Sequence, residues 1–99
     1  MEKYIFQERS KKQKIKMEEG KLIGKVTHYF GKIGVAVIEL EDTLKVGDTI
    51  RIVGGGTDFT QTVESMEIEH KKVKEARAGQ AIGLKVNQKV REGYKVYKI

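Results

Sequence analysis

The sequence predicts a small all-β protein, a closed β-barrel of about six strands preceded by a basic N-terminal arm. Three features predict this fold class: several segments alternate apolar and polar residues, 11 glycines punctuate them, and proline is absent. Alternation with a period of two residues is typical of strands that bury one face. No strong helical pattern occurs after residue 20. Closure into a barrel would leave no edge strand unpaired.

The predicted domain organisation is a basic arm over residues 1–19 and a barrel over residues 20–99. The arm's apolar residues fit neither the helical nor the strand period, so we expect a solvated arm or a short frayed helix. A nucleic-acid-binding arm is the alternative, because five cations fall within eight residues that contain no acid. These cations are Arg9, Lys11, Lys12, Lys14 and Lys16.

Three predicted strands occupy the first half of the barrel. Residues 21–30 are rich in branched and aromatic side chains, and a glycine-containing turn follows them. Residues 35–41 and residues 49–53 alternate, as half-buried strands do. Residues 54–58 begin with three glycines and are predicted to form a loop.

The second half of the barrel contains the longest predicted strand, residues 59–70. Its apolar positions change parity midway, which predicts a β-bulge at Glu64 and Ser65. Residues 71–77 are rich in charge and are predicted to form a loop. The last two predicted strands are residues 80–86 and 94–99.

Composition narrows the classes of protein that this chain can represent. The absence of cysteine excludes disulfides and thiolate metal sites. The longest apolar run, residues 33–38, is far shorter than the roughly 20 residues of a membrane-spanning helix. The N-terminus lacks the apolar stretch of a secretory signal. We therefore expect a cytoplasmic protein without a membrane span, and the 34% of charged residues is typical of heat-adapted proteins.

Catalytic patterns are weak. Ser10 and Ser65 are the only serines, and neither lies in a Gly-x-Ser-x-Gly turn. His28 is expected to take a hydrogen-bonded packing role in its strand. His70 would point away from the neighbouring glutamates, which leaves a metal site without enough ligands. The sequence therefore predicts no enzyme, no cofactor and no metal site.

A basic cluster is the better candidate for a binding site. The net charge of +6 permits contact with phosphate polymers, and clustered cations release counterions when they meet phosphate. The alternative is a solvated face that nearby glutamates partly neutralise. The candidate residues are Lys71, Lys72, Lys74 and Arg77.

Three motifs, read in order, resemble the second domain of translational GTPases of the elongation factor Tu type. These are the segment Phe30–Val37, the segment Leu44–Gly54, and the stretch Val63–Ile68 followed by Ala76–Leu84. The most telling is the Val-Gly-Asp turn of the second segment, in which Gly47 permits a tight turn and Asp48 accepts backbone N–H groups. The resemblance covers residues 20–99 and implies a Greek-key-like translation-protein barrel.

The resemblance also implies a function. The chain lacks the Gly-x-x-x-x-Gly-Lys-Ser/Thr phosphate loop, so nucleotide hydrolysis is not expected. In the full factors this barrel contacts the acceptor end of tRNA or ribosomal RNA, which makes a translation-factor-like module that binds RNA or a ribonucleoprotein the leading prediction. The alternative is a protein-interaction barrel that docks on a partner enzyme.

Overall fold

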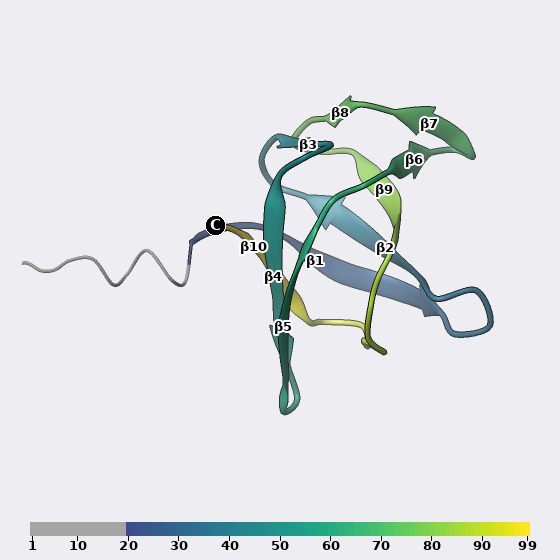
Figure 1. The fold of residues 1–99 in the computed structure, drawn as a ribbon. Helices are drawn as coiled ribbons and strands as arrows, with labels where there is room; N and C mark the ends of the chain where they lie inside the picture. Colours follow the sequence, from purple (N-terminus) through teal and green to yellow (C-terminus); the bar gives the residue numbers. More distant parts are fainter. Residues whose placement is uncertain (1–19) are drawn as a thin grey trace, which may run out of the picture.

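The computed structural model describes residues 20–99. This part of the chain consists of strands and the turns between them, with no helix (Figure 1). Eight strands form one antiparallel sheet in the order β5-β4-β10-β1-β2-β9-β6-β7, and β3 pairs with β8. The all-β prediction is confirmed. The strands are β1 (Lys21–Phe30), β2 (Val35–Leu40), β3 (Leu44–Lys45), β4 (Thr49–Gly54), β5 (Thr57–Thr62), β6 (Met66–Ile68), β7 (Lys71–Val73), β8 (Glu75–Ala76), β9 (Ala81–Lys85) and β10 (Lys95–Lys98).

The large sheet curls around a single interior (Figure 1). Its core consists of 17 buried apolar side chains, supplied by alternate positions of the strands and by the segments between them. Between residues 20 and 99 no polar or charged residue is buried. Each fully buried aliphatic side chain contributes about 1.5–3 kcal/mol to the stability of the fold, relative to the same side chain in water. The fully buried side chains with the largest volumes include Ile23, Ile38, Leu40, Ile50, Ile52 and Ile82.

The Val-Gly-Asp turn forms as predicted. Gly47 has a φ of 100°, a value that side-chain-bearing residues rarely adopt. A carboxylate oxygen of Asp48 accepts a hydrogen bond of 2.9 Å from the backbone N–H of Lys45. This turn leads the chain from β3 into β4.

A close approach of two strands explains why Gly24 lies inside β1. A Cβ atom at this position would lie 2.5 Å from the carbonyl oxygen of Glu39 in β2. The register of β1 with β10 shifts between Leu22 and Gly24, and such an irregularity increases the twist of a strand. The lack of a side chain at this point therefore helps the sheet to curl.

Three predicted segments differ from the structure. The predicted strand 59–70 is two strands, because the chain leaves the sheet at residues 63–65 instead of forming a bulge. The predicted loop 54–58 shrinks to a two-residue turn, since β4 continues to Gly54 and β5 begins at Thr57. The predicted loop 71–77 contains β7 and β8. The prediction of about six strands was therefore too low.

The hairpin of β6 and β7 is the largest of these corrections. Glu69 and His70 both have positive φ, at 51° and 68°, which is typical of a two-residue hairpin turn. β7 is an edge strand, and lysines on an edge strand discourage pairing with other chains. The lysines that the sequence analysis assigned to a loop are therefore compatible with a strand.

The backbone ladder of the large sheet ends at β5 and at β7, so backbone pairing does not confirm the predicted closure. The predicted arm, with Arg9, Lys11, Lys12, Lys14 and Lys16, lies outside the described residues. The division at residue 19 and the cytoplasmic location stay predictions.

Residues 20–99 contain no helix of the length and apolarity that crossing a membrane requires.

Candidate partner-docking surface

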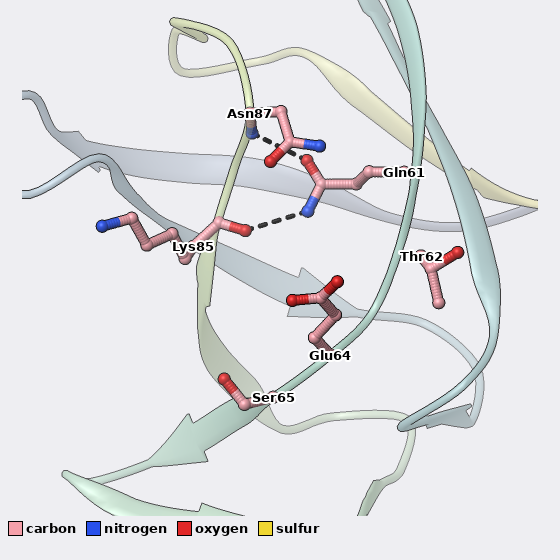
Figure 2. A pocket seen from close by; sticks show the side chains of 6 residues that line it. All are labelled: Gln61, Thr62, Glu64, Ser65, Lys85 and Asn87. Carbon is pink, nitrogen blue, oxygen red and sulfur yellow. Dashed lines mark hydrogen bonds between the residues drawn. The ribbon is translucent and has the colours of Figure 1, made fainter.

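Three adjoining hollows surround the segment that links β5 to β6. They share Ser65, and we call their combined surface the 64–66 groove. The first hollow, of ≈ 410 Å³, is lined by Gln61, Thr62, Glu64, Ser65, Lys85 and Asn87 (Figure 2). The second, of ≈ 210 Å³, is lined by Val35, Ser65, Met66, Glu67, Gly83 and Lys85. The third, of ≈ 320 Å³, is lined by Val46, Glu64, Ser65, Met66, Lys72, Val73 and Lys74.

The first hollow lies where β5 passes the end of β9 without backbone pairing, and we call this place the β5–β9 seam. Among residues 20–99, the side chain of Gln61 joins the two sides of the seam (Figure 2). The amide nitrogen of Gln61 donates a hydrogen bond of 2.9 Å to the carbonyl oxygen of Lys85. Its amide oxygen accepts one of 2.8 Å from the backbone N–H of Asn87.

The third hollow combines apolar and charged side chains. Val46, Met66 and Val73 supply the apolar part of its lining, and Val46 is 41% exposed. A backbone hydrogen bond of 2.9 Å from the N–H of Val46 to the carbonyl of Lys74 fixes the two sides of this hollow. Apolar surface framed by charge is the composition of many protein-binding sites.

The structure brings together only part of the predicted site. Lys72 and Lys74 line the third hollow, whereas Lys71 and Arg77 are exposed and line none of the three. The five predicted arm cations lie in the part of the chain that is not described. Lys85, which borders the first two hollows, was not among the predicted site residues.

Sequence reasoning also missed the centre of the groove, at Glu64, Ser65 and Met66. The available signal was the change of apolar parity within residues 59–70, which we interpreted as a bulge. The structure shows Val63 and Met66 buried with two exposed residues between them. That pattern is typical of a segment crossing from one strand to another along the rim of a core.

Neither histidine lies in the groove. The side chain of His28 is 52% exposed, and its Nδ1 lies 3.6 Å from a carboxylate oxygen of Glu92. Its ring meets the ring of Phe30 edge-on, with 4.4 Å between the two ring centroids. The packing role predicted for His28 is thus limited to an exposed contact with Phe30 at the end of β1. His70 occupies the exposed turn between β6 and β7. Within residues 20–99 no three potential metal ligands gather.

The two carboxyl groups with a shifted pKa stand apart from the groove. Hydrogen bonds of 2.8 and 2.6 Å from the Arg51 guanidinium lower the pKa of Asp58 across the β4–β5 hairpin. A hydrogen bond from Lys21 and another from the backbone N–H of Thr43 lower the pKa of Asp42. Each pair links neighbouring segments, which indicates a structural role.

Comparison with known proteins gives one family and two kinds of relative. The family model "Elongation factor Tu domain 2" matches residues 43–96. An uncharacterized protease of Methanocaldococcus jannaschii is 47% identical over 76 residues, which are 76% of this chain and 19% of that protein. A collagenase of Porphyromonas gingivalis is 40% identical over 78 residues, covering 77% and 22% of the two chains. This chain thus spans about a fifth of these relatives' length.

A solved structure shows the same fold. The C-terminal domain of a putative U32 peptidase of Geobacillus thermoleovorans superposes with a TM-score of 0.75 at 23% identity, over 80% of this chain and 92% of that domain. The barrel-type domain that the motifs predicted is confirmed by the family match.

The predicted role in translation is wrong. The relatives are a protease and collagenases, and they give no support to a module that binds tRNA, ribosomal RNA or the ribosome. The error has a physical cause. The motifs that carry the resemblance consist of core positions and turn residues, which specify a barrel and leave its partner open.

Proposed function

This chain belongs to the elongation factor Tu domain 2 family, and from that premise we propose that it is a non-catalytic accessory domain that docks on the remainder of a protease. One observation carries the proposal. A stretch of 76 residues, 47% identical to this chain, makes up only 19% of the M. jannaschii protease. The likeness to a C-terminal domain of a putative peptidase supports the same interpretation.

The chemistry of the groove supports a binding role. Ser65 is the only serine in it, and neither histidine lines it, so the groove offers no serine–histidine pair for nucleophilic catalysis. Its third hollow offers apolar side chains for burial and two lysines for ion pairs. A hollow lined by apolar side chains and lysines suits a protein surface that carries an aliphatic side chain next to carboxylates.

Closure of the barrel is part of the proposal. The side chain of Gln61 supplies across the β5–β9 seam the hydrogen bonds that a backbone ladder supplies elsewhere. A side chain can be displaced without breaking any strand pairing. The domain therefore presents its partner with a barrel that is sealed at one place by a single residue.

A chimera tests docking. The matched residues of the M. jannaschii protease are replaced by those of this chain, and hydrogen exchange is compared between the chimera and the isolated 99-residue chain. We expect slower exchange in the chimera at the linker 63–65 and the β6–β7 hairpin, because these surround the 64–66 groove. Identical exchange in the two proteins would refute docking through this surface.

A further inference from the structure

One side of the β5–β9 seam is an unpaired strand edge. The β4–β5 hairpin has a two-residue turn, and its flanking residues Gly54 and Thr57 pair directly. In such a hairpin the flanking pair is hydrogen-bonded, and the pairs that follow are alternately non-hydrogen-bonded and hydrogen-bonded, so the pairs of Thr60 and Thr62 are non-hydrogen-bonded. The backbone N–H and C=O groups of Thr60 and Thr62 therefore point away from β4. They point towards the open edge, because β5 has no other neighbour in the sheet that residues 20–99 form.

The other side of the seam also has backbone groups that a strand could use. The N–H of Val86 donates to the carbonyl of Gly34 at 3.0 Å, towards the β1–β2 hairpin. The carbonyl of Lys85 and the N–H of Asn87 point the other way, into the seam, where Gln61 meets them. Both sides thus present a strand edge.

The amide of Gln61 imitates the backbone of a missing strand. It donates to one residue and accepts from the residue two positions later. One residue of a strand parallel to its neighbour makes the same pair of hydrogen bonds. Since each neighbouring pair between β5 and β9 in the sheet is antiparallel, β5 and β9 run in opposite directions. A strand parallel to β9 would therefore be antiparallel to β5, the common arrangement for a strand added at an edge.

The lining of the seam suits an extended backbone. Thr62, Ser65 and Asn87 are short and uncharged, and Glu64 and Lys85 balance one another. The opposite edge of the sheet, β7, carries consecutive lysines that discourage strand addition, and β5 carries none. The unprotected edge is thus the one that borders a hollow of ≈ 410 Å³.

We propose that the β5–β9 seam binds an extended peptide segment of the partner as an added strand. The side chain of Gln61 occupies the position of this strand in the free domain, and the segment displaces it. The inference rests on the proposed docking function. Main-chain hydrogen bonds to Thr60 and Thr62 on one side and to Lys85 and Asn87 on the other would hold the segment, in the manner of β-strand addition. The chemistry selects a segment of small, uncharged residues.

We call this proposed strand-binding site at the β5–β9 seam the slot. Hydrogen exchange resolved to single residues tests it in the chimera and in the isolated chain. The N–H groups of Thr60 and Thr62 should exchange rapidly in the isolated chain and at least roughly tenfold more slowly in the chimera, where the added strand bonds them. The variant Gln61→Ala adds a second readout. It should speed exchange of the Asn87 N–H roughly tenfold in the isolated chain and leave it unchanged in the chimera.

The outcomes separate this inference from the proposed function. Protection of the β6–β7 hairpin with rapid exchange at Thr60 and Thr62 means that docking occurs without strand addition, and it overturns the slot alone. Equal acceleration at Asn87 in both proteins has the same meaning. If no N–H group in these regions exchanges more slowly in the chimera than in the isolated chain, docking and the slot are both overturned. If Gln61→Ala does not fold, the wild-type measurement at Thr60 and Thr62 decides the case.

Discussion

The side chain of Gln61 makes two hydrogen bonds, of 2.9 and 2.8 Å, that join β5 to residues 85–87. Truncation by Gln61→Ala removes both. A hydrogen bond contributes about 0.5–1.5 kcal/mol, and an abandoned partner costs more only when water cannot reach it. Both bonds lie at exposed positions, so water can replace them and the lower part of the range applies. We expect a loss of about 1 kcal/mol, which lowers Tm by roughly 4–8 °C in a domain of this size.

Urea unfolding followed by circular dichroism measures this loss in the isolated chain. Gln61→Glu keeps the acceptor for Asn87 and loses the donor to Lys85, so its stability should fall between those of the wild type and Gln61→Ala. The matched control is Gln88→Ala, which truncates an exposed glutamine in the loop beyond the seam. Surface substitutions of this kind usually stay within about 0.5 kcal/mol. If Gln61→Ala were no less stable than Gln88→Ala, the seam would not be held by this side chain.

Four further outcomes are expected. Gly24→Ala should lower the free energy of unfolding, measured in urea, by about 1–3 kcal/mol, because its Cβ would lie 2.5 Å from a carbonyl oxygen of β2. The control Gly83→Ala should lower it far less, because its Cβ would lie 3.6 Å from a side-chain atom. The pKa of Asp58 is lowered from its usual 3.8, so its carboxylate stabilises the fold at neutral pH, and this contribution is lost as the pH falls through the pKa of the folded state. In Asp58→Asn the midpoint of urea unfolding should therefore depend less on pH below about pH 4 than it does in the wild type. In the chimera, Lys72→Glu should reduce protection of the 64–66 groove and Lys71→Glu, on the same hairpin but outside the hollow, should not. The isolated chain should release no peptides from collagen, and any release above a buffer control would contradict the non-catalytic role.

The elements that sequence reasoning predicted correctly are those in which each local signal agrees with burial. The strand predicted over residues 21–30 matches β1 at both ends, and Ala36, Ile38 and Leu40 are buried as their alternation predicts. The turn at Gly47 follows from backbone freedom that glycine alone provides cheaply. Such signals act within a few residues, so one sequence suffices to identify them.

The features that were missed depend on contacts between distant segments. Lys71 and Lys72 look like loop residues because they are consecutive and charged, yet register pairs them with Ile68 and Glu67 across a hairpin. The partners of Gln61 lie 24 and 26 residues away, and nothing near Gln61 in the sequence indicates them. The groove was missed for the same reason, since its lining comes from segments that meet only when the sheet curls.

The failed functional prediction follows from which residues carry the family resemblance. In the segment Leu44–Gly54, Leu44, Ile50 and Ile52 are fully buried, and the turn between them supplies the bend into β4. These positions are constrained by the fold whatever the barrel binds. Glu64 and Ser65 are exposed between buried neighbours, so their identity is free to follow a partner. A barrel built to one core pattern can therefore serve a translation factor or a protease, and its exposed seam and groove are where the difference should be measured.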